Sequence, residues 1–318
     1  MNEDALIETL FKPLATAPGA DALGDDAATF GCGAGDVVVT CDALAAGVHF
    51  FAEDPPEAIA AKALRVNLSD LAAKGAEPFS YVLALALGQG TEVDWVRRFA
   101  DGLRADNARY GVHLLGGDTL RASVGGGTTI SVTAFGRTDA GAIVRRRGAR
   151  VGDTLLVTGT IGDAALGLAA RLAGEIADAA LLDRYLYPQP PVAAWRAVRE
   201  HASASMDVSD GLAGDLAKLC CAAGVGAVLE ADRVPLSPAV AALVAERPAA
   251  RDVALTGGDD YQILATLPPE RAAPFVAACA AVDVAVAEIG RIVPATEGVR
   301  VLDGGAEITL NDGRFQHF

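Results

Sequence analysis

Asn67-Leu-Ser-Asp-Leu-Ala-Ala-Lys-Gly-Ala76 places a carboxylate on a helix face that its neighbours make apolar. We expect a helix over residues 57–74. At ~3.6 residues per turn, the side chains within about 60° of Asp70 are those of Ile59, Ala63, Val66 and Ala73. An ionised carboxylate that leaves water without a partner costs roughly several kcal/mol. Asp70 is therefore expected to bind a cation or to be saturated with hydrogen bonds, unless it lies near the helix end and faces solvent.

The composition indicates a globular chain with a large core. Of the 318 residues, 52% are hydrophobic, and this length favours two domains over one. The five cysteines include one adjacent pair and no C-x-x-C spacing, so neither a zinc site nor a disulfide framework is indicated. No apolar run reaches the ~18 residues that span a bilayer, and the N-terminus lacks the pattern of a secretion signal. We expect a cytoplasmic protein without a membrane partner.

The charge distribution limits the partners. A net charge of −15 without a basic stripe argues against nucleic acid, because a polyanion is repelled. Phosphorylated small molecules stay compatible with this charge if divalent cations lie between. The one dense basic cluster, Arg145-Arg-Arg-Gly-Ala-Arg-Val-Gly-Asp153, is either a solvated linker or a phosphate contact. We interpret it as the boundary between an N-terminal domain, residues 1–148, and a C-terminal domain, residues 149–318.

Aspartates follow several expected strands. The strand over residues 37–42 ends at Asp42, and a later strand with two glycines ends at Asp118. The carboxyl ends of strands often carry functional residues in α/β sheets, and glycine lets a backbone come close to a ligand. Adjacent carboxylates also occur in Gly24-Asp-Asp-Ala-Ala28 and in Gly257-Gly-Asp-Asp-Tyr261. His49 is either a structural side chain or a substrate contact.

The segment Met206-Asp-Val-Ser-Asp-Gly-Leu212 resembles the Asp70 segment and precedes a second helix. The apolar residues of that helix, at i, i+4, i+7, i+8 and i+11, are Leu212, Leu216, Leu219, Cys220 and Ala223. Ser209 and Asp210 are residue types that cap helix N-termini, but a cap does not account for Asp207 as well. We infer that two similar αβ units supply carboxylates that face each other.

Two Gly-rich segments do not fit the common nucleotide motifs. Residues 31–36 precede a strand and do not open a helix, which excludes the dinucleotide fingerprint. The strand over residues 154–158 is followed by Gly159-Thr-Ile-Gly-Asp163 and a helix, an order that could place a phosphate at a helix N-terminus. The chain contains no G-x-x-x-x-G-K-[ST], which excludes a Walker-type NTPase.

Carboxylates expected in loops or at strand ends form one chemical set. They are Asp25, Asp26, Asp42, Asp70, Asp118, Asp207, Asp210, Asp259 and Asp260. Such oxygen ligands select hard cations, above all Mg²⁺, which shares its coordination shell with substrate phosphates. Phosphoryl transfer from a nucleotide is therefore the expected reaction class.

Two alternatives remain at this point. A phosphatase nucleophile of the D-x-D-G kind needs a spacing one residue shorter than that of Asp207 and Asp210. A regulatory module that binds nucleotide or metal needs fewer carboxylates than this chain has. A metal titration coupled to ATP hydrolysis separates the regulatory module from an enzyme.

Together, several segments resemble the thiamine-monophosphate kinase family. They are Gly24–Ala28, Thr40–Asp42 with Gly47–Phe50, Lys62–Ala76, Gly116–Asp118, Asp207–Gly211 and Gly257–Tyr261. The resemblance covers nearly the whole chain in the right order, and its motifs are specific in combination and weak singly. The wider superfamily includes aminoimidazole ribonucleotide synthetase and selenophosphate synthetase, which also bind ATP.

The resemblance implies an α/β fold of two domains, an N-terminal mixed sheet with helices and a C-terminal αβ domain. It implies a homodimer in which the N-terminal sheets pair in a β-barrel-like interface. The implied reaction is the ATP-dependent phosphorylation of thiamine phosphate to thiamine diphosphate. It proceeds by direct, Mg²⁺-assisted, in-line transfer of the γ-phosphoryl group.

Roles for individual residues are also implied by the resemblance. Residues that would hold several Mg²⁺ ions are Asp26, Thr40, Cys41, Asp42, Asp70, Asp118, Asp207 and Asp210. Of these, the catalytic ones are Asp42, Asp70, Asp118, Asp207 and Asp210. Those that would contact ATP are Gly117, Asp118, Arg146 and Ser209, and those for thiamine phosphate are His49, Asp259 and Phe315. Asp259 stands where the family usually has Glu, and Cys41 stands where Thr is usual.

Overall fold

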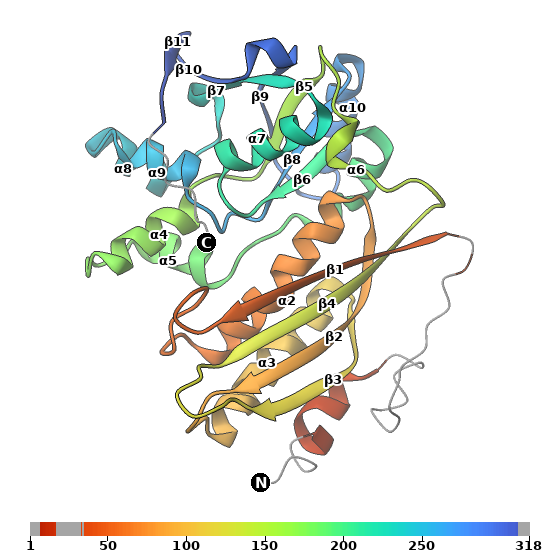
Figure 1. Ribbon diagram of the computed structural model, residues 1–318, viewed down its shortest axis with the longest axis vertical. Helices are drawn as coiled ribbons and strands as arrows, with labels where there is room; N and C mark the ends of the chain where they lie inside the picture. The colour runs from red at the N-terminus through yellow and green to blue at the C-terminus, as the bar shows by residue number, and fades with distance from the viewer. Residues whose placement is uncertain (1–6, 17–32, 34, 311–318) are drawn as a thin grey trace. The chain divides into compact units, whose positions relative to one another are not determined.

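The computed structural model describes residues 7–16, 33 and 35–310 and divides the chain into two compact units. Unit 1 comprises Met1–Leu71 with Glu77–Gly141, and unit 2 comprises Ala72–Ala76 with Ala142–Phe318. Each unit contains its own sheet and its own helices (Figure 1). The boundary expected between residues 148 and 149 stays a prediction.

Unit 1 is built on a four-stranded mixed sheet with the strand order β1-β4-β2-β3. Its strands are β1 Asp36–Ala45, β2 Glu77–Leu87, β3 His113–Arg121 and β4 Thr129–Thr138. β4 is antiparallel to both β1 and β2, whereas β2 and β3 are parallel. Parallel strands need a crossover connection, and α3 Val93–Tyr110 supplies it between β2 and β3.

Helices α2 Pro56–Ala73 and α3 cover one face of this sheet (Figure 1). Gly102 lets them pack closely, since a Cβ there would lie 2.7 Å from the carbonyl oxygen of Glu57. A buried ion pair joins the same helices: Arg65 Nε and Nη2 donate to Asp106 Oδ2 and Oδ1 at 2.8 and 2.7 Å. Loss of one partner from such a pair costs about 3–5 kcal/mol, so the pair fixes α2 against α3.

The other face of the unit 1 sheet remains largely uncovered in the described part of the chain. Val39 on β1 is 55% exposed and Leu120 on β3 is 53% exposed. Val82 and Phe135 are half-buried on this side, where Ala15 packs against them. A sheet face with this many apolar side chains is typical of an interaction surface.

Unit 2 contains a seven-stranded mixed sheet with the strand order β11-β10-β7-β9-β5-β8-β6. Its strands are β5 Thr154–Thr158, β6 Ala204–Val208, β7 Gly226–Glu230, β8 Gln262–Leu267, β9 Val286–Val293, β10 Val299–Asp303 and β11 Ala306–Ile308. β5 lies between β8 and β9 and is antiparallel to both, while β7 and β10 are parallel.

The helices of unit 2 are α4 Asp163–Leu172, α5 Ala179–Leu186, α6 Trp195–His201, α7 Leu212–Ala223, α8 Pro238–Glu246, α9 Ala250–Thr256 and α10 Pro269–Ala280. Of these, α7 packs on one face of the sheet and α6 and α10 pack on the other, while α4, α5, α8 and α9 pack on one another. The leucines of α7 pack against Leu155 of β5 and Met206 of β6. Phe275 of α10 and Val198 of α6 pack in a separate cluster with Leu156 of β5. Both faces of β5 are thus buried, which explains its continuous apolar sequence.

The expected fold class is confirmed, because both units combine a mixed sheet with helices. Two expected strand ends are wrong: β1 continues past Asp42 to Ala45, and β3 continues past Asp118 to Arg121. Pairing with neighbouring strands extends both strands, since Ala45 still pairs with Thr129 of β4. Within the described residues, no helix has the length and hydropathy needed to cross a membrane.

Candidate active site

In unit 1, β1 and α2 bring two of the predicted site residues into contact. Thr40 Oγ1 donates a hydrogen bond to Asp70 Oδ2 at 2.5 Å. Asp70 is half-buried, so the expectation that it turns toward the protein and finds a partner is confirmed in part. That partner is a neutral hydroxyl, which leaves the negative charge of Asp70 available to a cation.

Asp42 lies on the same side of β1 as Thr40. Its backbone N–H donates to Asn67 Oδ1 at 3.1 Å, and Asn67 Nδ2 donates to the carbonyl oxygen of Ala63 one turn earlier. The fully buried Asn67 therefore joins the middle of β1 to α2. In the Asn-Leu-Ser-Asp sequence, Asn67 thus links β1 to α2, and Asp70 supplies a carboxylate that could bind a cation.

Two further predicted residues of unit 1 are held locally. His49 Nδ1 accepts a hydrogen bond from the N–H of Ala45 at 3.0 Å, and Lys62 Nζ donates to the carbonyl oxygen of His49 at 3.0 Å. Because Nδ1 is an acceptor, the neutral ring carries its proton on Nε2. Cys41 is exposed on the opposite side of β1 from Asp42, where its Sγ lies 3.5 Å from Ser131 Oγ.

Asp118 lies on the other face of the unit 1 sheet from Asp42. It is in register with Ala84 of β2, which pairs with Ser131 of β4, and these residues are exposed or half-buried. Asp42 is in register with Val132, which is buried under the helices. Side chains of paired residues point to the same face. Asp118 therefore does not lie beside Asp42 in this chain, and the assignment of both to one metal site stays a prediction.

Gly117, next to Asp118, is required by the sheet itself. A Cβ at this position would lie 1.7 Å from the carbonyl oxygen of Leu83. The backbone of β3 bulges there, because the register with β2 shifts between Tyr81 and Val82. A glycine in this place is explained by the close approach of two strands, with or without a ligand.

In unit 2, the predicted carboxylates Asp207 and Asp210 lie at the junction of β6 and α7. Asp207 is the penultimate residue of β6 and is 4% exposed. The helix is capped by Gly211, with no side-chain cap bond, so the expectation of a Ser209 or Asp210 cap is wrong. Asp210 instead forms an ion pair with Lys218.

The loop that carries Asp259 is joined directly to this junction. Asp259 N–H donates to the carbonyl oxygen of Ser209 at 2.9 Å, and Tyr261 N–H donates to that of Val208 at 2.7 Å. Asp259 and Tyr261 both adopt positive φ angles, 72° and 51°. The hydroxyl of Tyr261 donates to Asp259 Oδ1 at 3.0 Å and orients that carboxylate. The predicted nucleotide contact Ser209 and the predicted substrate contact Asp259 are therefore neighbours.

Arg146 is exposed on a short turn, η4 Arg146–Gly148, that packs against β6 and α7. Gly148 permits this contact, since a Cβ there would lie 1.8 Å from the carbonyl oxygen of Ser203. The turn therefore packs on the two elements between which Asp207 and Asp210 lie. A guanidinium group is a side chain that binds phosphate, and Arg146 stays a predicted ATP contact.

Asp260 is enclosed beside the Asp259 loop. Its Oδ1 accepts a hydrogen bond from the N–H of Gly162 at 2.9 Å, while its buried Oδ2 has no hydrogen-bond partner among the described residues. Burial holds the pKa of Asp260 well above its usual range, and the nearby carboxylates of Asp163, Asp259 and Asp215 add to the effect. A cavity of ≈ 10 Å³ adjoins this carboxyl group, about the space of one water molecule.

Asp215 and Lys218 are residues of this region that the sequence interpretation missed. Asp215 lies on the buried side of α7, at the i+3 position from Leu212, and its side chain is 0% exposed. Burial raises its pKa, although a hydrogen bond from Lys218 opposes the shift. The reasoning that selected Asp70, a carboxylate on an apolar helix face, also applies to Asp215.

The donor set fits a hard divalent cation in its chemistry, because it consists of carboxylate and hydroxyl oxygens. In the described residues, however, no group of three or more His, Cys, Asp or Glu side chains is close enough to hold a metal ion. The assignment of these residues to bound metal ions therefore stays a prediction. The predicted residues Asp26 and Phe315 lie outside the described residues.

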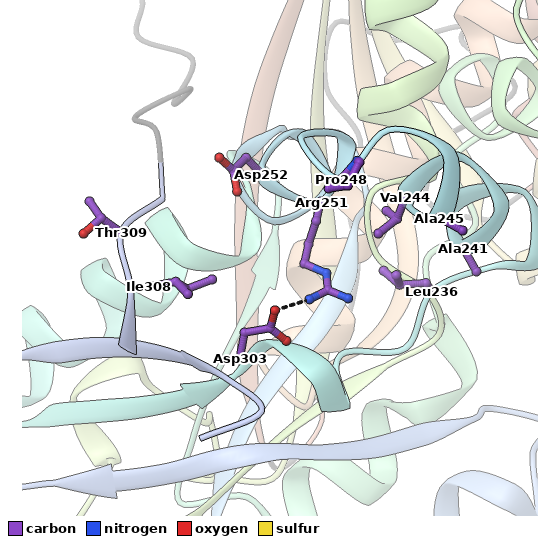
Figure 2. Close-up of a pocket in the computed structure, with 10 residues that line it drawn as sticks. All are labelled: Leu236, Ala241, Val244, Ala245, Pro248, Arg251, Asp252, Asp303, Ile308 and Thr309. Carbon is purple, nitrogen blue, oxygen red and sulfur yellow. Dashed lines mark hydrogen bonds and ion pairs between the residues drawn. The ribbon is translucent and has the colours of Figure 1, made fainter. Parts of the chain in front are cut away.

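A larger pocket, of ≈ 620 Å³, lies in another part of unit 2. Figure 2 shows Arg251 in the middle of this pocket, with Nη1 donating to Asp303 Oδ2 at 2.6 Å. Most of the other lining side chains are apolar, among them Leu236, Val244 and Ile308. No residue of the predicted site lines it, so size alone does not identify the functional site here.

Sequence comparisons match both halves of the chain to known families. The model for AIR synthase related protein, N-terminal domain, matches residues 24–138, and the model for its C-terminal domain matches residues 150–303. The thiamine-monophosphate kinase of Caulobacter vibrioides is 44% identical over 310 residues, which are 95% of this chain and 87% of that protein.

Solved structures agree with the sequence comparisons. Thiamine-monophosphate kinase from Stenotrophomonas maltophilia K279a is 36% identical with a TM-score of 0.81, and the match covers 96% of each chain. AaThiL complexed with AMPPCP and TMP is 32% identical with a TM-score of 0.78, over 99% of this chain and 97% of that one. Since sequence and fold match over nearly its whole length, the chain belongs to the thiamine-monophosphate kinase family of AIR synthase related proteins.

Proposed function

We propose that this protein transfers the γ-phosphoryl group of ATP to thiamine phosphate and so forms thiamine diphosphate. The relative AaThiL has been solved with AMPPCP, an ATP analogue, and with TMP. The structural observation that carries the proposal is the bond between Asp259 N–H and the carbonyl oxygen of Ser209. It joins the loop expected to bind nucleotide to the loop expected to bind the acceptor. We propose that the reaction takes place in the cytoplasm, where ATP is available.

The acceptor determines what the protein must supply. A phosphate monoester has a second pKa of about 6, so at pH 7 thiamine phosphate is largely ionised and needs no strong general base. The main barrier is repulsion between two polyanions. We propose that two kinds of positive charge reduce this repulsion: the exposed guanidinium group of Arg146 and cations that the carboxylates hold.

The proposed cations are several Mg²⁺ ions, held by Asp26, Thr40, Cys41, Asp42, Asp70, Asp118, Asp207 and Asp210. When bound, Mg²⁺ neutralises phosphate charge and holds donor and acceptor in line. At Cys41 the side chain points away from Asp42, so the backbone carbonyl oxygen is the atom that we propose as a ligand. Thr40 already donates its proton to Asp70, which leaves lone pairs of its hydroxyl oxygen for a cation.

At the acceptor end we propose His49, Asp259 and Phe315 as contacts to thiamine phosphate. The thiazolium ring is cationic, which suits a carboxylate and an aromatic face. Asp259 is one methylene shorter than the glutamate usual in the family. The Tyr261 hydroxyl orients the Asp259 carboxylate, and the positive φ of Asp259 directs its side chain differently from that of a residue with negative φ. These two features support Asp259 as a contact to thiamine phosphate although its side chain is shorter.

A direct assay tests the proposed function. The purified chain is incubated with Mg²⁺, ATP and one of four acceptors: thiamine phosphate, free thiamine, an aminoimidazole ribonucleotide precursor or selenide. We expect ADP and thiamine diphosphate in equal amounts with thiamine phosphate, and at most background turnover with the others. ATP binding without turnover on any acceptor would instead support a regulatory module.

We also propose that the chain forms a homodimer through the uncovered face of the unit 1 sheet. Its exposed apolar side chains, such as Val39 and Leu120, support a barrel-like pairing of two such sheets.

We expect sedimentation velocity to give twice the chain mass for the wild type. Val39→Glu should give a folded monomer, because dimerisation would bury the new charge without a partner. Val276→Glu on α10 of unit 2, where Val276 is 39% exposed, is the matched control and should remain dimeric. A monomeric wild-type chain would contradict this proposal.

A further inference from the structure

Asp215 is a buried carboxylate whose two oxygens are both engaged. Oδ2 accepts hydrogen bonds from the backbone N–H groups of Ser209 and Asp210, each at 2.9 Å. Oδ1 accepts from Lys218 Nζ at 2.8 Å. One side chain therefore fixes two consecutive peptide groups of the turn that leads into α7.

The Ser209 peptide is held on its other side as well. Its carbonyl oxygen accepts from the N–H of Asp259, and Gly258 lies so close that a Cβ there would be 2.3 Å from the same oxygen. Gly211 makes the reciprocal approach, since a Cβ there would be 2.3 Å from the carbonyl oxygen of Thr256. With no space between the two loops, a shift of Ser209 displaces Asp259.

We propose that Asp215 is a positioning residue for both ligands. Its carboxylate holds the Ser209 and Asp210 peptide groups where the nucleotide binds and, through the Ser209 carbonyl, holds Asp259 where the acceptor binds. The proposal rests on the proposed function for the identity of the two ligands. Asp215 itself contacts neither ligand. It acts by accepting hydrogen bonds from the two peptide groups, and its negative charge is not required.

Two substitutions separate acceptor from charge. Asp215→Ala removes the acceptor, so two N–H groups lose their partner. Asp215→Asn keeps one oxygen that can accept both bonds and replaces the oxygen that faces Lys218 with an NH₂ group. The readouts are the Kd of AMPPCP with Mg²⁺ by calorimetry, KM and kcat for thiamine phosphate, and hydrogen exchange of the ligand-free chain.

We expect Asp215→Ala to weaken AMPPCP binding by about 10-fold or more and to raise the KM for thiamine phosphate by a similar factor. Exchange should accelerate at the amides of Ser209, Asp210 and Asp259. Asp215→Asn should stay within about 3-fold of the wild type in both constants. A folded Asp215→Asn that loses 10-fold in AMPPCP affinity would overturn the proposal, and this variant decides the question if Asp215→Ala does not fold.

Asp153 provides a matched control in unit 2. Its buried carboxylate accepts bonds from the N–H of Arg150 and the hydroxyl of Ser203, away from both loops. Asp153→Ala should lower Tm but leave the Kd of AMPPCP and the KM unchanged. If both variants lose the same Tm and neither changes the Kd, Asp215 contributes only to stability, and the proposal is wrong.

Lys218→Met removes the partner of Asp215 Oδ1 and, with it, the ion pair with Asp210. It should have a smaller effect than Asp215→Ala, because both N–H groups keep their acceptor, Oδ2. An equal effect would assign the role to the ion pair and overturn the proposal. Hydrogen exchange in the ligand-free chain tests the positioning role independently of the reaction.

Unchanged exchange at the Asp259 amide in Asp215→Ala would refute the positioning role of Asp215, even if the enzyme is active. Accelerated exchange in a chain that does not phosphorylate thiamine phosphate refutes the function alone.

Discussion

Asp70→Asn and Asp207→Asn are each expected to lower kcat/KM for thiamine phosphate by at least about 10³-fold, while the chain remains folded. Both substitutions remove one negative charge and keep the shape of the side chain. Thr40 Oγ1 can still donate to the amide oxygen of an asparagine at position 70, so the contact between β1 and α2 survives. The loss then reports the missing charge at the site of the transferred phosphoryl group. Steady-state kinetics and circular dichroism measure the two quantities.

Matched asparagine substitutions elsewhere control for burial. Asp54 in unit 1 is 4% exposed and accepts the N–H of Phe51 through Oδ2, and Asp153 in unit 2 is also 4% exposed. Asp54→Asn and Asp153→Asn should keep kcat/KM within about 3-fold of the wild type. Full activity in Asp70→Asn or in Asp207→Asn would remove that carboxylate from the phosphoryl-transfer site.

The repeating patterns of the sequence were sufficient to predict several of the elements. The helix expected over residues 57–74 is α2 Pro56–Ala73, and the strand expected over residues 154–158 is β5. Long apolar stripes and continuous apolar runs specify such elements locally. Strand ends were less predictable: β1 ends where its pairing with β4 ends, and residues far apart in the sequence decide that.

The face on which Asp118 lies is a property that the sequence does not determine. Successive strand residues point to opposite faces, so one bulge reverses the side of every later residue. β3 shifts its register against β2 between Tyr81 and Val82 of that strand, just before the glycines. No single-chain pattern reveals such a shift. Asp215, in contrast, could have been found, because its position on the apolar stripe of α7 is visible in the sequence.

Asp260→Asn is expected to stabilise unit 2 at neutral and higher pH. In the folded chain, burial holds the pKa of Asp260 well above its usual range, whereas in the unfolded chain it is about 3.9. Below about pH 4 both states are protonated, and the carboxyl group does not oppose folding. As pH rises from there to the folded-state pKa, unfolding releases a proton, and stability falls by about 1.4 kcal/mol per pH unit. Asparagine does not titrate, so the variant does not lose this stability as the pH rises.

The substitution keeps the hydrogen bond that the side chain accepts from Gly162. An amide oxygen can accept this N–H, and the amide nitrogen takes the place of Oδ2, which has no partner in the part of the chain that the structure describes. The free energies of unfolding of variant and wild type should therefore be similar near pH 4 and diverge upward, as urea unfolding at several pH values would show. Asp283→Asn, at an exposed position, is the control for the same chemical change on the surface. A constant difference for Asp260→Asn would mean that burial, together with the nearby carboxylates of Asp163, Asp259 and Asp215, does not keep Asp260 protonated. In that case Asp260 would be a buried, ionised carboxylate, and a bound cation would have to balance its charge.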